Sequence, residues 1–292
     1  PNLKWHELMD TGPFISDTFL EFGPEGEVAA LKGIAIKLGE DEDVSVLFDT
    51  ETLRWVAAFE GQVSLAGTPW DGKHGGNSFL PEEAGGYWFY TSDGSGWAVD
   101  GNWTDPREKG YGPLPKDYAH YSGLYRHGTD IILTYTVGET EVMELPGVAD
   151  GVITRTLKIG DTTRNLQMLL TEPDPEGREL REVSVTVTGA PEGVAVKKLD
   201  DGKEVLDIPA GTTAFEARIA YVAEGRTAPD ADLVSLSGLI EGGDAIFPET
   251  IAVKGQLGQD TKPYVVDTLP LPDDNPWASQ VRFGGFDFFS DG

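Results

Sequence analysis

Apolar and polar residues alternate along much of the chain, and this alternation predicts β-strands. A half-buried strand directs every second side chain to the core, which produces a period of two. The pattern is clearest in seven segments: 34–38, 44–48, 131–137, 152–159, 183–187, 215–221 and 251–257. Asp-Gly pairs, which favour tight hairpin turns, recur along the chain. The best helical candidate is short, at 230–239, so the sequence predicts an all-β protein.

The distribution of aromatic residues and glycine divides the chain further. Residues 55–128 contain five of the seven tryptophans, many glycines and few long alternating runs, whereas 129–270 alternate regularly. We expect residues 1–275 to form one large antiparallel β-sandwich, with long aromatic, Gly-rich loops from 55–128 and regular sheets from 129–270. We expect residues 276–292, which end in an aromatic, strand-like stretch, to be a linker and the start of a truncated following module.

Charge and composition exclude several classes of function. The 292 residues include 50 Asp and Glu against 22 Lys and Arg, a formal net charge of −28. A field of this sign repels phosphate backbones and anionic lipids, which excludes nucleic acid and membrane surfaces as expected partners. The chain has no cysteine, so thiolate catalysis, disulfides and zinc–thiolate sites are excluded. The acidity favours a secreted or periplasmic location.

The stretch 87–103 is the most informative for binding. Its tryptophans flank Gly-rich turns, and flat aromatic faces on rigid loops suit sugar rings, while nearby Asp and Asn side chains bond the hydroxyls. The alternative is that these tryptophans pack in the core beneath the loops. The expected ligand-binding residues are Trp88, Tyr90, Trp97, Trp103, Asp93, Asp100, Asn102, His120 and Arg126.

The segment 116–128 offers candidates for catalysis. Histidine can act as an acid or base, and an arginine can bind a carboxylate, so an enzymatic site would use His120, Tyr121, Tyr125, Arg126 and His127. Histidine at a strand entrance is also a common hydrogen-bonded structural residue. Motifs for nucleophilic, phosphate-binding, dinucleotide-binding and metalloprotease sites are missing. No reaction class is supported by a motif, which favours a noncatalytic role.

Carboxylates in the Gly-rich turns leave a calcium site open. Asp93, Asp100 and Asp105 could supply oxygen ligands to Ca²⁺. Their spacing lacks the regular pattern of a helix-flanked calcium loop, and 50 acidic residues make chance clusters common. We therefore expect no required cofactor, with Ca²⁺ as the alternative.

Several stretches together resemble an uncharacterised N-terminal domain of large secreted bacterial proteins. In those proteins the domain precedes a β-propeller similar to sugar dehydrogenases, often followed by cytochrome c modules. The stretches that carry the resemblance are Met9-Asp-Thr-Gly-Pro13, Lys32-Gly-Ile-Ala-Ile-Lys-Leu-Gly39, Phe48-Asp-Thr-Glu-Thr-Leu-Arg-Trp55, His120-Tyr-Ser-Gly-Leu-Tyr-Arg-His-Gly128, Thr134-Tyr135, Glu144, Thr154-Arg155-Thr156, Asn275-Pro-Trp277 and Gly285-Phe-Asp-Phe-Phe-Ser-Asp-Gly292. The resemblance implies an excised module whose partners include the C-terminal propeller and the cytochrome c modules.

A weaker, fold-level similarity relates the order of strands to the β-supersandwich of mutarotase-like sugar enzymes and lyases. Fold does not transmit function, and no residue matches their catalytic groups by motif.

Three functional hypotheses follow. The first is a noncatalytic carbohydrate-binding or accessory module of a larger secreted sugar-oxidoreductase-like protein involved in polysaccharide utilisation. The second is a carbohydrate-active enzyme (a glycosidase, lyase or epimerase) that uses the His/Tyr/Arg cluster or a carboxylate pair. The third is a structural docking domain without a ligand. They predict different environments for Trp88, Trp97 and Trp103: a groove, a pocket beside histidine, or the core.

Overall fold

The chain divides into two compact units, Pro1–Gly243 and Asp244–Gly292, here called unit 1 and unit 2. The computed structural model describes residues 12–21, 27–39, 43–65, 78–81, 86–174, 177–230, 233–245, 248–260, 263–272 and 274–276. The boundary between the units lies inside the range 1–275 that the sequence assigns to one domain. The expected following module at 276–292 lies outside the described residues, apart from Pro276.

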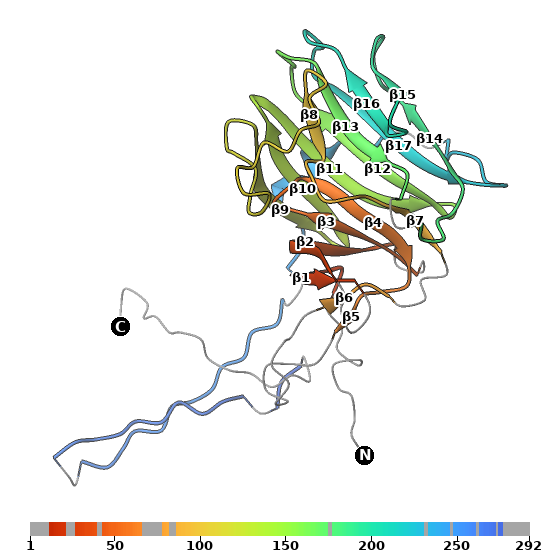
Figure 1. Ribbon diagram of the computed structural model, residues 1–292. Helices are drawn as coiled ribbons and strands as arrows, with labels where there is room; N and C mark the ends of the chain where they lie inside the picture. The colour runs from red at the N-terminus through yellow and green to blue at the C-terminus, as the bar shows by residue number, and fades with distance from the viewer. Residues whose placement is uncertain are drawn as a thin grey trace. The chain divides into compact units, whose positions relative to one another are not determined.

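Seven strands form the first sheet of unit 1, in the order β5-β6-β1-β2-β3-β4-β7 (Figure 1). They are β1 (Phe14–Leu20), β2 (Val28–Leu38), β3 (Val44–Asp49), β4 (Arg54–Glu60), β5 (Ser64–Leu65), β6 (Ser78–Phe79) and β7 (Tyr87–Tyr90). Every pair is antiparallel except β1 with β6. β3 is buried along its whole length, because apolar clusters lie on both faces of this sheet.

Two further sheets complete unit 1. The six-stranded sheet has the order β14-β17-β12-β11-β10-β9, and the four-stranded sheet has the order β15-β16-β13-β8. Their strands are β8 (Trp97–Val99), β9 (Ala119–His127), β10 (Asp130–Val137), β11 (Thr140–Ala149), β12 (Val152–Ile159), β13 (Leu166–Thr171), β14 (Val183–Thr188), β15 (Ala195–Lys198), β16 (Glu204–Ile208) and β17 (Phe215–Ala223). Asp150 and Gly151, both at positive φ, form the β11–β12 turn, as an Asp-Gly hairpin requires.

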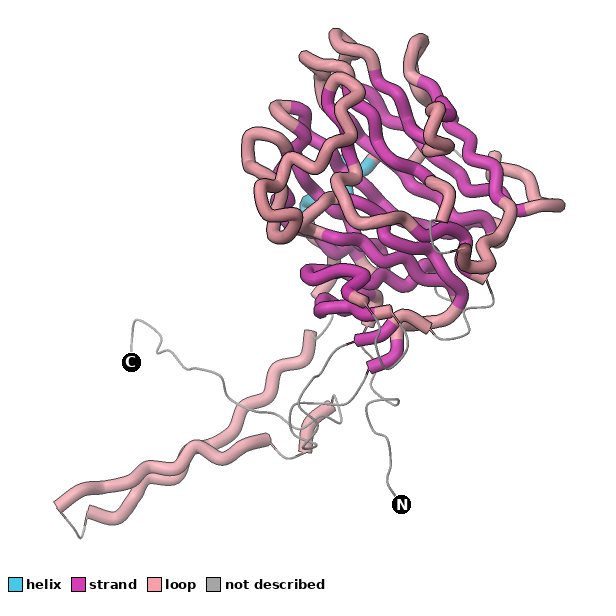
Figure 2. Tube along the Cα trace, in the orientation of Figure 1, coloured by secondary structure: helices cyan, strands magenta, loops and turns pink. Residues whose placement is uncertain are grey.

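One main core joins the three sheets as a sandwich. Its buried side chains come from all of them and include Phe48, Trp55, Tyr135, Leu157, Met168, Leu206 and Tyr221. Figure 2 shows strands throughout unit 1. The described residues also include a short 3₁₀ helix, Leu236–Glu241 (η2). In the part of the chain that is described, no helix has the length and apolar character needed to cross a membrane. The predicted all-β, antiparallel, sandwich-like fold is confirmed.

A buried ion pair between Glu144 and Arg155 lies in the main core. Glu144 is fully buried and Arg155 is 1% exposed. The pairing is bidentate: Arg155 Nε donates to Glu144 Oε1 at 2.8 Å, and Nη2 donates to Oε2 at 2.9 Å. Burial disfavours the charge of Arg155, but the Glu144 carboxylate and the neighbouring Tyr221 and Tyr135 together outweigh this and raise its pKa. The guanidinium therefore stays charged, as a two-pronged bond to a carboxylate requires.

This pair connects all three sheets through its remaining partners. The Tyr135 hydroxyl donates to Glu144 Oε2 at 2.7 Å, and the Trp55 indole, from the first sheet, donates to Oε1. The guanidinium lies 4.7 Å from the centre of the Trp55 ring, and its Nη1 donates to the Leu169 carbonyl of the four-stranded sheet at 3.4 Å. Burial and the Glu144 charge raise the pKa of Tyr135 well above its usual range, so its hydroxyl stays protonated as a donor.

Unit 2 contains two extended segments that run side by side. The prediction of a strand at 251–257 is wrong. Among the described residues of unit 2, one pair, Gln256 and Thr268, exchanges backbone hydrogen bonds, both of 2.8 Å. A two-stranded ribbon without a third strand or a core is marginally stable in water. Its exposed large apolar residues are Val253, Leu257, Tyr264, Val265, Val266, Leu269 and Leu271.

Breaking the buried pair is expected to be costly. Glu144→Gln leaves the charge of Arg155 buried without its counter-charge and should lower the free energy of unfolding by about 3–5 kcal/mol. The double variant Glu144→Gln/Arg155→Met carries no buried charge and should be more stable than the single variant. Denaturant titration measures both.

The matched control is an ion pair on the surface. Lys197 binds Asp207 at 2.6 Å and is 55% exposed, so Lys197→Ala should change stability by less than about 1 kcal/mol. A Glu144→Gln variant as stable as this control would contradict the role given to the pair.

Candidate functional site

The predicted stacking platforms Trp88 and Trp97 are buried. Trp97 is fully buried and Trp88 is 3% exposed. Trp97 begins β8 and packs edge-on against Tyr135, with 6.1 Å between ring centres. The adjacent Gly96 permits this, since a Cβ atom there would overlap the carbonyl oxygen of Leu53. Because both rings are buried, the prediction that these two tryptophans stack on a ligand is wrong. At Trp97, the adjacent glycine serves close packing and not loop exposure.

Tyr90 is also part of the interior. It is 7% exposed, its hydroxyl donates to Glu21 Oε1 at 2.7 Å, and the Arg178 guanidinium lies 3.9 Å from its ring centre. The pairing of β4 with β7 slips by one residue, so that Trp88 is the extra residue of a bulge. The bulge breaks the alternation that places Trp88 and Tyr90 on one face. Tyr90 is therefore unavailable as a ring that flanks a ligand.

Trp103 is half-buried, unlike the other two predicted tryptophans. Its indole Nε1 donates to the Gln167 side chain at 3.1 Å, and Gln167 in turn donates to Asp207 at 2.8 Å. The ring thus lies beside the four-stranded sheet and is fixed by a polar chain. Asn102 is exposed, and its side chain accepts a bond from the Thr104 amide.

The three carboxylates proposed for calcium do not converge. Asp100 accepts a bond from Arg164 Nε at 3.0 Å, whereas Asp93 and Asp105 both bind Arg107, at 3.3 and 2.8 Å. Hydrogen bonds from these arginines lower the pKa of Asp100 and of Asp105. Within the described ranges, no group of three or more His, Asp or Glu side chains is placed to hold a metal ion.

The proposed catalytic residues are spread along β9. His120 is exposed, while the next residue, Tyr121, faces the core, 6.2 Å from the Phe48 ring. Tyr125 is 43% exposed, and Arg126 Nε donates to the carbonyl of Gly128. His127, at the end of the strand, lies against the Gly243 backbone. Tyr121 faces the core whereas His120 and Tyr125 are exposed, so these five residues do not share one face of β9.

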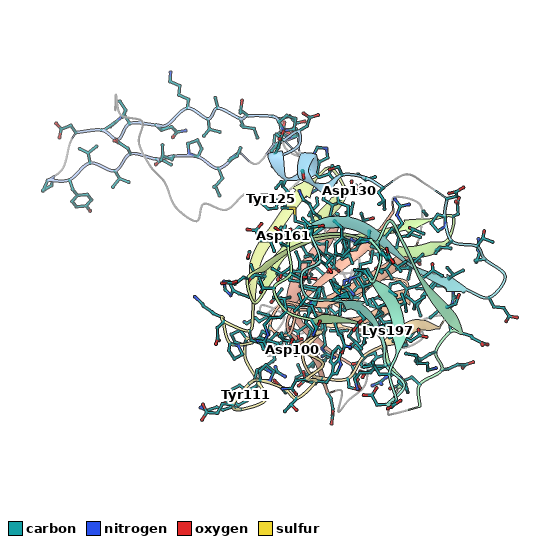
Figure 3. The ribbon with its side chains drawn as sticks, turned by 90° about the horizontal axis from the view of Figure 1, so that it is seen from above. Asp100, Tyr111, Tyr125, Asp130, Asp161 and Lys197 are labelled. Atoms are coloured by element: carbon teal, nitrogen blue, oxygen red, sulfur yellow. The ribbon has the colours of Figure 1, made fainter. Side chains whose placement is uncertain are left out.

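A small hollow at one end of unit 1 brings charged and apolar side chains together. We call it the Tyr111 hollow; it encloses about 110 Å³ and is lined by Val28, Ala29, Ala30, Leu31, Asp49, Glu51, Arg54, Asp93, Arg107, Gly110 and Tyr111. Of the predicted binding residues, Asp93 is the one in this lining. Figure 3 shows Tyr111 projecting from the edge of unit 1, away from Tyr125 and Asp130.

The rim of the Tyr111 hollow is apolar and exposed. Val28, Leu31 and Tyr111 are 51%, 41% and 63% exposed. Among the described residues of unit 1, five large apolar side chains are exposed to this degree, and three of them line this hollow. Exposed apolar groups gathered around a few polar groups are typical of binding sites.

Two arginines with buried side chains form the floor. The side chains of Arg54 and Arg107 are 3% and 5% exposed, and both approach Asp93, at 3.7 and 3.3 Å. Arg54 also donates to the Ala29 carbonyl at 3.1 Å, which attaches β4 to the start of β2. Burial raises the pKa of Glu51, and the neighbouring Asp49 raises it further.

Two other hollows lack an exposed apolar rim. One, of about 230 Å³, is lined by Asp117, Tyr118, Glu139 and Arg164, among others. The second, of about 200 Å³, lies between β2 and the β9–β10 turn and includes Asp130. Neither contains a residue from the exposed large apolar set.

Sequence reasoning missed Tyr111, Arg107, Glu51 and Arg54. A signal for Tyr111 was present in Gly110-Tyr-Gly112, where both glycines have positive φ. An aromatic residue between two such glycines cannot be buried by regular strand pairing, so it is a candidate for an exposed ring.

A family model described as "Domain of unknown function (DUF6797)" matches residues 46–144. The comparisons with curated proteins and with solved structures give no match. The matched range includes Glu144, Tyr135 and Trp55 of the buried network, but not Arg155. It also includes seven of the eleven residues that line the Tyr111 hollow.

The burial of Trp97 leads to a stability prediction. Trp97→Ala should lower the free energy of unfolding by about 3–5 kcal/mol, because it leaves a large cavity in the main core. The half-buried Trp103 is the control, and Trp103→Ala should cost less than half as much. A Trp97→Ala variant that keeps its stability but loses ligand binding would contradict this prediction and would support Trp97 as a residue that stacks on the ligand.

Proposed function

We propose that this chain is a noncatalytic carbohydrate-binding module and that it binds sugar at the Tyr111 hollow. The observation that carries the proposal is the exposed Tyr111 ring, 63% exposed, beside Val28 and Leu31 and above a charged floor. A sugar ring offers an apolar C–H face and hydroxyl groups, so it needs an aromatic or apolar surface next to hydrogen-bonding side chains.

Each group has a distinct part in binding. The Tyr111 ring packs on the C–H face of the sugar, and Val28 and Leu31 exclude water from the same side. Asp93, with a side chain that is 65% exposed, accepts bonds from hydroxyl groups, as does Glu51. Arg107 holds Asp93 in place, which reduces the entropy lost when the ligand binds.

The proposal extends to the setting of the module. We propose that it is an accessory domain of a larger secreted or periplasmic protein that oxidises sugars, with a propeller and cytochrome c modules as its partners. Its net charge of −28 is consistent with a partner other than nucleic acid or anionic lipid.

A structural domain without a ligand is the second candidate. The burial of Trp88 and Trp97 favours it, because these residues then serve packing. The enzymatic hypothesis would need either a carboxylate pair or the β9 residues acting together, and the β9 residues point to both faces of that strand.

Tyr111→Ala should weaken sugar binding about tenfold, equivalent to about 1.4 kcal/mol, because the aromatic contact is lost. Isothermal titration calorimetry with a panel of soluble oligosaccharides measures the affinity, and product analysis of the same mixtures tests for catalysis. Thermal unfolding should be unchanged, since the ring is exposed.

Tyr125→Ala is the matched control, since Tyr125 is an exposed tyrosine at the other end of unit 1 (Figure 3). It should leave the affinity unchanged. Equal affinities of the Tyr111→Ala variant and the wild type would place the sugar elsewhere, and the absence of binding to any sugar would favour the structural domain. New products would support an enzyme.

A further inference from the structure

The donors on the floor of the Tyr111 hollow are already occupied. Arg54 donates from Nη1 to the carbonyls of Thr91 and Ser92, from Nη2 to Ala29, and from Nε to the Thr52 hydroxyl at 3.3 Å. Nη2 also lies 3.7 Å from Asp93, beyond hydrogen-bond distance, so four of its five N–H groups donate hydrogen bonds and the fifth faces this carboxylate. Because the Arg54 side chain is also buried, it offers a ligand little donor capacity.

Arg107 is engaged in a similar way. Its Nε and Nη2 donate to Asp105 at 3.0 and 2.8 Å, Nη2 also reaches Asp93, and Nη1 donates to the Gly112 carbonyl at 3.3 Å. All three guanidinium nitrogens donate to the loop, and four of the five N–H groups have a partner. Two-pronged binding of a carboxylate or sulfate on a ligand would have to displace these bonds, so an acidic sugar is a poor fit.

The groups in the hollow that remain available to a ligand are hydrogen-bond acceptors. The side chain of Asp93 is 65% exposed, and its two oxygens accept from the Gly94 amide and from Arg107. Within the described residues, the Glu51 carboxylate accepts no hydrogen bond and forms no ion pair, although Lys32 and Arg107 act on it at longer range. A ligand that fits must supply donors.

The aromatic rim of the hollow also favours a ligand that carries a positively charged donor. The Tyr111 ring is exposed at the mouth of the hollow, and an aromatic face attracts a cation. An ammonium group can donate hydrogen bonds to the two carboxylates and also make a cation–π contact with the ring. A neutral hydroxyl can donate to the carboxylates but makes no cation–π contact.

We propose that the Tyr111 hollow selects amino sugars with a free ammonium group, which donates to Glu51 and Asp93 and lies against the Tyr111 ring. This inference rests on the proposed function, because it names the sugar class that the same site binds. Neutral sugars bind there more weakly, and uronates most weakly of all.

Calorimetry at slightly acidic pH with three tetrasaccharides tests the inference: glucosamine, N-acetylglucosamine and glucose oligomers of equal length. The glucosamine oligomer should bind at least tenfold more tightly than the other two. Glu51→Gln, which keeps the shape of the side chain, should reduce this preference to less than threefold. Tyr111→Leu keeps an apolar contact without the aromatic face and should also reduce the preference, so the inference remains testable if one variant fails to fold.

A control variant distinguishes a preference caused by the carboxylates of the hollow from one caused by the overall negative charge of the protein. Glu139→Gln removes one exposed carboxylate from a different hollow and should keep the full preference. Equal binding of the three oligosaccharides would overturn the amino-sugar inference and leave the proposed function in place. A preference that survives Glu51→Gln, or that Glu139→Gln removes equally, would also overturn it, whereas no binding of any oligosaccharide would overturn both.

Discussion

The structure of unit 1 depends on one carboxylate, Glu144, which is buried among donors from two sheets. Arg155 and Tyr135 lie in its own sheet, and Trp55 reaches it from the seven-stranded sheet. A buried charge without such partners would cost several kcal/mol. The sheets must therefore meet in one arrangement, the one in which the indole, the phenol and the guanidinium converge. Apolar packing supplies most of the stabilisation, while this network links the buried carboxylate to donors from two of the sheets.

The same strand connects the core to the candidate site. Arg54 and Trp55 are consecutive residues of β4 and point to opposite faces of the sheet. Trp55 binds the buried carboxylate, while Arg54 reaches the carbonyls of Ala29 and Thr91 and forms the floor of the Tyr111 hollow. The hollow is thus held by a rigid element, and its loop residues Asp93 and Tyr111 add the exposed groups. This division is common, because a firm scaffold presents variable loops.

The fold class was predictable because alternation and Asp-Gly turns are local signals. The strands at 44–48, 131–137 and 152–159 and the Asp150-Gly151 turn follow from them directly. Local signals could not predict whether the tryptophan side chains are buried or exposed. A bulge at Trp88 and the close approach of Gly96 to the Leu53 carbonyl are tertiary features, and a Gly-rich aromatic stretch looks the same whether it is exposed or packed. Of the candidate site, the sequence analysis predicted Asp93, and the Gly110-Tyr-Gly112 stretch carries a further signal for Tyr111. The other lining residues come from separate stretches of the sequence, and only the folded sheet brings them together.

Chemical-shift mapping during a titration with amino-sugar oligosaccharide is the most direct test of where this protein binds its ligand. Each of the seven tryptophans carries one indole N–H group that reports on its own surroundings, and the glycines of the loop report on the Tyr111 hollow. We expect the amide signals of Gly94, Gly110 and Gly112 to shift, while the indole signals of Trp88, Trp97 and Trp103 stay in place. Shifts confined to those indoles, with the Gly110 and Gly112 amides unchanged, would contradict this prediction.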